Sequence, residues 1–225
     1  MQVSELFADL PGHESRTVLS AARSRNFVSR EVVFLAGDPA KEVFLLASGW
    51  VKVTQVSGSG LEVILRIDPP GEIIGTFGPG AEGKHTSTAQ ALEECEMLVW
   101  DSASFESLLE RFPLLRRNMG RILERRLSEL EVRLCEISTE TVSPRLAHAL
   151  IRLLGRMGRK TNGHVEINLS QEALAQMTAM TSFTVSRVLS KWEQQGLVSL
   201  RRGALIVRNY EGLLSLCKGG SLPEA

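Results

Sequence analysis

Residues 169–198 read LSQEALAQMTAMTSFTVSRVLSKWEQQGLV, and their polar and apolar residues recur as two short helices joined by a tight turn require. Ser170 can cap the first helix, and Glu172 lies in its first turn, where an acidic side chain favours the N-terminus. The turn is expected over residues 178–181. The expected buried residues are Leu174, Ala175 and Met177 on the first helix and a stripe at helical spacing on the second, Val185, Val188, Leu189 and Trp192. The stretch therefore predicts a helix-turn-helix.

The opposite face of the second helix carries side chains that suit the major groove of DNA. Arg187 is a fork-shaped donor for guanine O6 and N7, and Phe183 offers an apolar contact for a thymine methyl. An alternative is a solvated helix face with an incidental arginine. The residues expected to read bases are Ser182, Phe183, Ser186 and Arg187.

A basic hairpin is expected directly after this helix. Gly196 ends the helix, and residues 197–207, LVSLRRGALIV, form two β-rich runs around a turn. Such a hairpin is typical of the wing of a winged helix, where it contacts phosphate. The residues expected at DNA phosphates are Thr181, Thr184, Lys191, Arg201 and Arg202.

An amphipathic segment, residues 113–138, precedes this region and starts at Pro113, a residue suited to a first helical turn. Its apolar residues alternate at spacings of four and three, as in a coiled-coil seam: Leu123, Leu127, Leu130, Leu134 and Ile137. Such a stripe can also pack on its own domain. Charges flanking the stripe and the helix-turn-helix after it favour a parallel homodimer. Residues 141–144 are expected to be the hinge to the next helix.

The N-terminal hundred residues contain short β-type runs over residues 30–38, 41–49, 50–60, 61–72 and 94–101. Turn residues separate them at the spacing of an antiparallel sandwich or barrel, for example Gly37-Asp38 and Ser48-Gly49. The predicted fold is α+β. It consists of an antiparallel β-roll sensor domain (1–112), a long dimerisation helix (113–138), a winged helix-turn-helix (139–218) and a flexible tail (219–225).

The net charge of zero hides a difference between the two parts of the chain. Residues 1–138 hold 15 Lys and Arg against 20 Asp and Glu, a balance of −5, whereas residues 139–218 hold 11 against 5, a balance of +6. Because affinity for nucleic acid depends on the local field at the phosphates, a neutral total does not exclude DNA as a partner.

The composition favours a cytoplasmic protein with no membrane partner. No apolar run reaches the ~18 residues of a membrane span, and the N-terminus has no charged segment followed by an apolar one. The three cysteines, Cys95, Cys135 and Cys217, are dispersed and odd in number. They are expected to be buried thiols in a reducing compartment rather than a disulfide framework or a zinc site.

Taken in order, the β-roll, the seam helix and the winged helix resemble the Crp/Fnr family of bacterial transcription regulators. Residues 71–78, GEIIGTFG, resemble a turn motif of the family's nucleotide-binding cassette, and residues 181–198 resemble its recognition helix and wing entry. The resemblance implies a homodimer on a two-fold symmetric DNA site that contacts or blocks RNA polymerase. It also implies that Ser186 and Arg187 read bases. Phe183 stands where the family usually has a glutamate, so the half-site need not be the standard one.

The resemblance also bears on a possible small-molecule effector. In members that bind cyclic AMP, an arginine and a serine hold the cyclic phosphate, and ungapped alignment from Gly71 places Thr86 and Ser87 at these positions. Glu72 remains where those members hold the ribose, but Leu130 and Glu131 replace the hydroxyls that read adenine. A phosphate without its cation is poorly compensated, so cyclic AMP is expected to bind weakly or not at all. The expected pocket comprises Gly71, Glu72, Ile73, Ile74, Gly75, Thr86, Ser87, Thr88, Leu130 and Glu131.

Other cofactors find little support in the sequence. Iron-sulfur members of the family need four cysteines, three of them near the N-terminus, whereas this chain has none before Cys95. His85 is a lone loop histidine, which is expected to be solvent-exposed, so haem is not expected. His148, on an apolar helix face, and His164, in a turn, have no partner at metal-ligand spacing. No metal site is therefore expected.

The sequence contains no nucleophile paired with a base and no Walker-type phosphate loop, so no enzymatic activity is expected. It predicts a DNA-binding transcription regulator whose β-roll binds, or once bound, a small effector. The alternative is a β-roll sensor that acts through protein–protein contacts, with the winged helix as its interaction surface. A lack of salt-sensitive DNA binding would favour that alternative. The identity of the effector, the target genes and the direction of regulation do not follow from the sequence.

Overall fold

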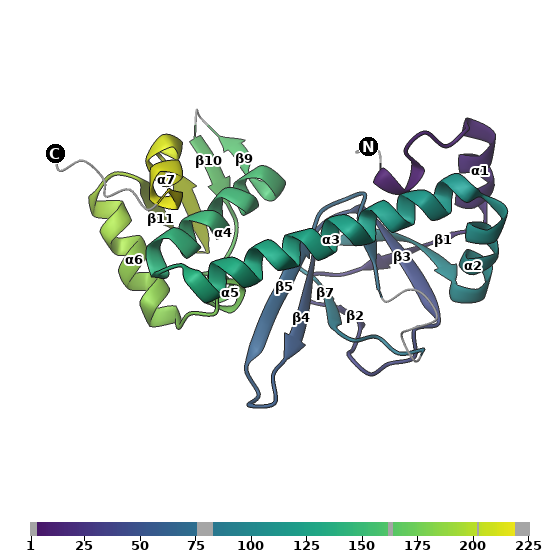
Figure 1. Cartoon of the computed structure of the whole chain (residues 1–225), viewed down its shortest axis with the longest axis horizontal. Helices are drawn as coiled ribbons and strands as arrows, with labels where there is room; N and C mark the ends of the chain where they lie inside the picture. The colour runs from purple at the N-terminus through teal and green to yellow at the C-terminus, as the bar shows by residue number, and fades with distance from the viewer. Residues whose placement is uncertain (1–3, 76–82, 162–163, 202, 219–225) are drawn as a thin grey trace. The chain divides into compact units, whose positions relative to one another are not determined.

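The computed structural model describes residues 4–75, 83–161, 164–201 and 203–218 (Figure 1). The described residues fall into two compact units, which divide between Glu129 and Leu130. The division falls inside the long helix α3 (Pro113–Thr139). The domain limits expected from sequence lie at the ends of this helix and remain a prediction, as does the flexible tail, which lies outside the described residues.

The first unit contains two four-stranded antiparallel sheets, with strand orders β1-β8-β3-β6 and β2-β7-β4-β5. This architecture confirms the predicted β-roll. The strands are β1 (Arg23–Phe27), β2 (Val32–Phe34), β3 (Glu42–Ser48), β4 (Val51–Val56), β5 (Glu62–Asp68), β6 (Ile73–Ile74), β7 (Thr88–Ala91) and β8 (Cys95–Asp101). The sequence reasoning missed β1, β6 and β7, because RSRNF and TAQA have little β-type character and β6 has only two residues.

Strand β3 is buried on both faces and joins two hydrophobic cores. Successive strand residues point to opposite faces of a sheet. Phe44 and Leu46 lie in a core shared by residues of both sheets, whereas Val43 and Leu45 lie in a second core lined by helices. This is why the run EVFLLAS is apolar without alternation.

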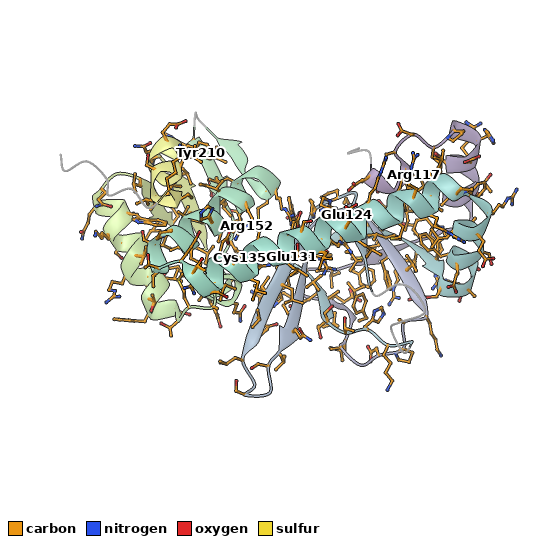
Figure 2. All side chains as sticks on the ribbon, in the orientation of Figure 1. Arg117, Glu124, Glu131, Cys135, Arg152 and Tyr210 are labelled. Carbon is orange, nitrogen blue, oxygen red and sulfur yellow. The ribbon has the colours of Figure 1, made fainter. Side chains whose placement is uncertain are left out.

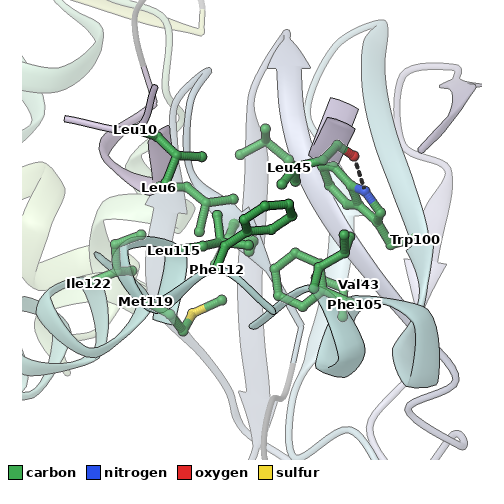
Figure 3. Close-up of a cluster of buried hydrophobic side chains, with 13 residues drawn as sticks. Leu6, Leu10, Val43, Leu45, Trp100, Phe105, Phe112, Leu115, Met119 and Ile122 are labelled. Carbon is green, nitrogen blue, oxygen red and sulfur yellow. Dashed lines mark hydrogen bonds between the residues drawn. The ribbon is translucent and has the colours of Figure 1, made fainter. Parts of the chain in front are cut away.

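The second core packs helices against the sheet that contains β3 (Figure 3). The helices are η1 (Glu5–Phe7), α1 (Gly12–Ser20), α2 (Ser102–Arg111) and the start of α3. Trp100 of β8 is fully buried there, and its Nε1 donates to the carbonyl oxygen of Val18 at 2.8 Å. Leu115, Met119 and Ile122 place one face of α3 in this core, so the first half of α3 belongs structurally to the β-roll.

The second unit is a helical domain with a four-stranded sheet in the order β11-β12-β10-β9. Its helices are α4 (Val142–Met157), α5 (Gln171–Thr178), α6 (Ser182–Gln194) and α7 (Tyr210–Cys217). Its strands are β9 (Arg159–Thr161), β10 (His164–Ile167), β11 (Val198–Arg201) and β12 (Ala204–Val207). The pairing of β11 with β12 confirms the predicted wing hairpin.

The hinge between α3 and α4 is shorter than the sequence suggested. Only Glu140 and Thr141 separate the two helices, because α4 already begins at Val142. Pro144 lies in the first turn of α4, where a missing N–H breaks no helical hydrogen bond. The expectation that residues 141–144 form the hinge is therefore corrected to residues 140–141.

The last turns of α3 are held to α4 by charged side chains. Glu136 is buried and pairs with Arg152, which Figure 2 labels on α4. His148 Nε2 lies 3.2 Å from Glu140 Oε1, just after α3, and His148 Nδ1 lies 3.9 Å from Glu136 Oε1 of α3. This histidine therefore faces carboxylates rather than an apolar environment, which corrects the sequence expectation.

The cysteines differ in exposure. Cys95 is buried and Cys217 is half-buried, and burial raises the pKa of the Cys217 thiol to about 11. Cys135 is exposed on α3, so the expectation of three buried thiols is wrong for this residue. Among the described helices, none is both long and apolar enough to span a bilayer.

Candidate nucleic-acid interface and effector cassette

A hydroxyl cap begins each helix of the motif, and the cap of α6 lies in the turn between α5 and α6. Ser170 Oγ accepts from the Ala173 amide at 3.1 Å, and Thr181 Oγ1 accepts from the Thr184 amide at 3.1 Å. Between the helices, Ala179 takes a left-handed conformation with φ of 54°. The helix-turn-helix is thus confirmed, although Thr178 belongs to α5 rather than to the turn.

The inner faces of α5 and α6 fix the orientation of the motif. Val185, Leu189 and Trp192 are buried as expected, whereas Val188 is half-buried. On α5, Met177 is half-buried and Thr178 is buried instead, with its hydroxyl donating to the Leu174 carbonyl at 2.7 Å. Because this hydroxyl is satisfied within its own helix, a threonine can occupy a core position that an apolar pattern does not reveal.

The outer face of α6 presents the expected base-reading residues to solvent. Ser182, Phe183 and Arg187 are exposed, and Ser186 is half-buried. Phe183 is 75% exposed, which is unusual for a large apolar side chain and leaves its ring free for a partner. Of the expected phosphate contacts on this motif, Thr181 and Lys191 are exposed and Thr184 is half-buried.

The wing is tied to the end of α6. Glu193 Oε1 accepts from the Leu200 amide at 2.7 Å, a contact that the sequence analysis did not identify. Arg201 is exposed and pairs in register with Ala204, and Gly203 in the connecting turn has φ of 75°. Arg202 lies outside the described residues.

The effector cassette centres on Glu72, whose carboxylate is held by two arginines of α3. Arg125 Nη2 lies 2.6 Å from Glu72 Oε1, and Arg126 Nη2 lies 3.0 Å from Glu72 Oε2. Arg126 also donates to the Ile73 carbonyl, and burial lowers the pKa of its guanidinium. In the sequence, both arginines are charges that flank the seam. Their proximity to Glu72 depends on the packing of α3 on the β-roll.

A second carboxylate lies close to this cluster. Asp68 is almost fully buried, and its Oδ2 accepts from Arg66 Nε at 2.8 Å. Burial raises the pKa of Asp68, and the charges of Arg66 and Arg126 oppose that shift. The cassette therefore contains buried charges of both signs.

Several residues expected to line the pocket have other roles. Ile73 and Ile74 are fully buried, Ile73 in the core lined by helices and Ile74 in the core between the sheets, and their place in an effector pocket stays a prediction. Gly71 is tied through its amide to the Leu46 carbonyl at 2.7 Å. The remaining positions differ in exposure: Thr86 is exposed; Gly75, Ser87 and Thr88 are half-buried; Leu130 and Glu131 are exposed and belong to the second unit.

His85 is only 4% exposed, contrary to the sequence expectation of a solvent-exposed loop residue. Its ring stacks on Phe34 with centroids 3.6 Å apart. Within the part of the chain that the structure describes, no three His, Cys, Asp or Glu side chains are arranged to hold a metal ion.

Known protein families match both the β-roll and the helix-turn-helix region of the chain. A cyclic nucleotide-binding domain matches residues 24–112, and a Crp-like helix-turn-helix domain matches residues 144–216. A cyclic AMP receptor protein of Thermus thermophilus is 32% identical over 208 residues, which cover 92% of this chain and 94% of that protein. The transcriptional activator protein anr of Pseudomonas aeruginosa is 28% identical over 179 residues, 79% of this chain and 73% of that protein.

Solved structures share the fold. The FixK2 structure from Bradyrhizobium japonicum superposes with a TM-score of 0.77 at 21% identity, covering 87% of this chain and 96% of that chain. The catabolite activator protein of Thermus thermophilus is 30% identical with a TM-score of 0.55, covering 96% of this chain and 99% of that chain.

A cyclic nucleotide-binding β-roll followed by a Crp-like helix-turn-helix defines a DNA-binding transcription regulator. The chain belongs to the Crp/Fnr family of such regulators.

Proposed function

We propose that the protein acts as a homodimer that reads a two-fold symmetric DNA site through α6 of each subunit. The observation that carries this proposal is the apolar seam of α3, which remains exposed in the single chain. Its five side chains are 39% to 65% exposed: Leu123, Leu127, Leu130, Leu134 and Ile137. Soluble monomers rarely leave such a regular apolar row in water, and pairing with a second copy buries it.

In this dimer Arg187 and Phe183 face base edges, and Arg201 of the wing contacts phosphate. The N-terminal residues of a recognition helix usually reach the bases, and the exposed side chains of α6 begin at its first turn. Two-fold symmetry then requires two half-sites about one helical turn, roughly 34 Å, apart.

Binding-site selection with the purified protein, combined with sedimentation at equilibrium, tests the proposal. The expected result is a dimer that selects an inverted repeat. A monomeric protein would contradict the proposal, as would selection of a single half-site. DNA binding that is absent at low salt would point instead to the winged helix as a protein-interaction surface.

We also propose that the β-roll responds to a small effector other than cyclic AMP. Two features support this: Thr86 supplies no charge for a cyclic phosphate, and two guanidinium groups already hold the Glu72 carboxylate. One relative is named a cyclic AMP receptor protein and another a cAMP-activated regulator, so a direct test is informative. Calorimetry should detect no binding at physiological cyclic AMP concentrations, and the nucleotide should leave DNA affinity unchanged. A micromolar dissociation constant for cyclic AMP would contradict the proposal that the effector is another molecule.

The proposed outcome of DNA binding is a change in transcription, through contact with RNA polymerase or through blocking it, without enzymatic chemistry. In vitro transcription from a selected site distinguishes the two directions. Increased transcript would assign activation and decreased transcript repression. Equal transcript with and without bound protein would contradict both.

A further inference from the structure

Two arginines from other helices hold the carboxyl end of α5. The last carbonyl groups of an α-helix have no partner inside the helix, and the helix dipole makes cations favourable there. Arg133 Nη2 of α3 donates to the Met177 carbonyl at 3.0 Å, and Arg145 Nη1 of α4 donates to the Thr178 carbonyl at 3.4 Å. Both α3 and α4 thus contact the helix-turn-helix at the point where its turn begins (Figure 1).

The backbone of the turn explains why these carbonyl groups take donors from outside α5. The amides of Ala179 and Met180 both bond to the Ala175 carbonyl, and Ala179 has a left-handed conformation. Neither amide bonds to the last two carbonyl groups of the helix, those of Met177 and Thr178. The two guanidinium groups supply these donors instead, so the end of α5 depends on residues distant in sequence.

Arg133 differs from Arg145 because it lies on the other side of the hinge. Arg145 belongs to α4, which follows the hinge, whereas Arg133 belongs to α3 and lies between the seam residues Leu130 and Leu134. A charged residue beside a coiled-coil seam usually pairs across the interface. Arg133 is half-buried and donates to α5 instead. It therefore joins the seam of the proposed dimer directly to the helix-turn-helix.

The position of α5 determines that of the recognition helix α6. The two helices pack on each other, and their inward side chains are buried, among them Leu174, Val185 and Leu189. By contrast, only Glu140 and Thr141 connect α3 to α4. A few connecting residues can absorb a large change in backbone angles, whereas packed helices move as a unit. Side-chain contacts across the hinge therefore decide the angle at which α6 is held.

The other ion pairs across the hinge do not replace this contact. Glu136 and His148 join α3 to α4, as does Arg152, but none of these pairs reaches α5 or α6. Without the Arg133 contact, the seam would be connected to the helix-turn-helix through α4 alone.

We propose that Arg133 is a positioning residue for DNA binding, which fixes the angle between the seam of α3 and the recognition helix. This inference rests on the proposed homodimer. In that dimer the angle sets the separation of the two copies of α6, and so the spacing of half-sites that the protein accepts. The affinity of α6 for one half-site does not depend on Arg133 in this role.

Duplexes with the selected half-sites at their selected spacing, or with two base pairs inserted between them, test this role. The insertion moves one half-site by about 7 Å and rotates it by about 70° around the duplex axis. The wild type should bind the inserted duplex at least about tenfold more weakly than the selected one. Arg133→Met keeps an unbranched chain without the donor, and should reduce this discrimination at least about threefold. Arg133→Lys keeps a cation that can donate to a carbonyl, and should restore most of the discrimination.

Arg121→Met is the matched control, because Arg121 is exposed on the same helix outside the seam and the substitution removes the same charge. It should leave the discrimination unchanged. All three variants should sediment as dimers and bind a duplex with one half-site as tightly as the wild type does. A ratio of affinities between the two spacings is not altered by a uniform loss of charge, so it separates positioning from general attraction to DNA.

Unchanged discrimination in Arg133→Met would overturn the positioning role. Loss of binding to one half-site in this variant would also overturn it, because Arg133 would then maintain the fold of the helix-turn-helix itself. A dimeric wild type that selects an inverted repeat but accepts both spacings equally would overturn this inference and leave the proposed function intact. A monomeric wild type would contradict the proposed function and this inference together.

Discussion

At the level of single residues, the two exposed arginines of the DNA-binding domain lie on different elements. Arg187 is a planar donor on the exposed face of α6, whereas Arg201 lies at the end of β11 in the wing. A bidentate contact to a base carries sequence information, whereas a phosphate contact does not. The two arginines should therefore fail in different ways when they are removed.

Arg187→Ala should cost about 1–3 kcal/mol on the selected site and relax the preference at one base pair of each half-site. Arg201→Ala should weaken specific and non-specific binding alike, because phosphates are present on every sequence. Binding-site selection and titration at two salt concentrations measure both effects. Full retention of base preference in Arg187→Ala, with loss of preference in Arg201→Ala, would show that the roles are reversed.

Asp68 gives a prediction about pH. Because burial raises its pKa above the ordinary value of 3.8, the folded chain binds this proton more tightly than the unfolded chain does. The contribution of Asp68 to the free energy of unfolding therefore falls as the pH rises from 3.8 through the pKa of the folded state. Asp68→Asn removes the titration, so its free energy of unfolding relative to wild type should increase as the pH rises above about 4.

Urea unfolding at several pH values measures this difference. Ser59→Ala, in an exposed turn, is the control. Because neither serine nor alanine titrates, the difference in free energy of unfolding between this variant and wild type should not change with pH. A difference for Asp68→Asn that is constant, or that decreases with pH, would mean that the Arg66 and Arg126 charges outweigh burial.

At the element scale, α3 has two different faces along its length. Leu115, Met119 and Ile122 fill the core of the β-roll, whereas the seam from Leu123 onward is exposed. Glu131 and Cys135, labelled in Figure 2, lie along this second part of the helix. The first half of α3 thus packs on its own domain. The second half exposes the apolar seam that the proposed dimer would bury.

Leu127→Glu combined with Leu134→Glu should convert the proposed dimer to monomers, because pairing would bury four unpaired carboxylates at a cost of several kcal/mol. Val132→Glu is a matched control, since Val132 is 55% exposed on the same helix but lies outside the seam. Sedimentation should find a monomer for the double variant and a dimer for the control. An unchanged dimer in the double variant would place the interface elsewhere.

At the scale of the whole molecule, charge is divided along the chain rather than balanced locally. Residues 139–218 hold 11 Lys and Arg against 5 Asp and Glu, although the whole chain is neutral. DNA binding should therefore depend strongly on salt despite the zero net charge. The net charge alone would predict little dependence on salt.

Three cations per subunit are expected at or near phosphates, Lys191, Arg201 and Arg202. In a dimer they would release about six counterions, which gives a slope of roughly −5 for log K against log salt. Titrations on non-specific duplex at several salt concentrations measure the slope. Arg201→Ala should reduce its magnitude by about two, one per subunit, and a slope near zero would exclude phosphate contacts by these residues.

Features that depend on neighbours along the chain follow from the sequence alone. The helix-turn-helix follows from apolar residues at helical spacing with hydroxyl caps, and the wing follows from two β-rich runs around a glycine turn. Both signals are local, because a helix repeats every ~3.6 residues and a hairpin joins adjacent strands. The seam of α3 is visible for the same reason, although the sequence alone left open whether it packs internally.

Features that join distant parts of the chain follow only from the folded structure. Arg125 and Arg126 meet Glu72 only because the start of α3 packs on the β-roll, and a charge beside a leucine stripe looks the same in sequence whether it is solvated or paired. His85 is buried because residues 83–85 bond to the turn at residues 37–40, a pairing between segments far apart in the chain. Burial and ion pairing depend on which surfaces meet, and a periodic pattern records only that a surface is apolar.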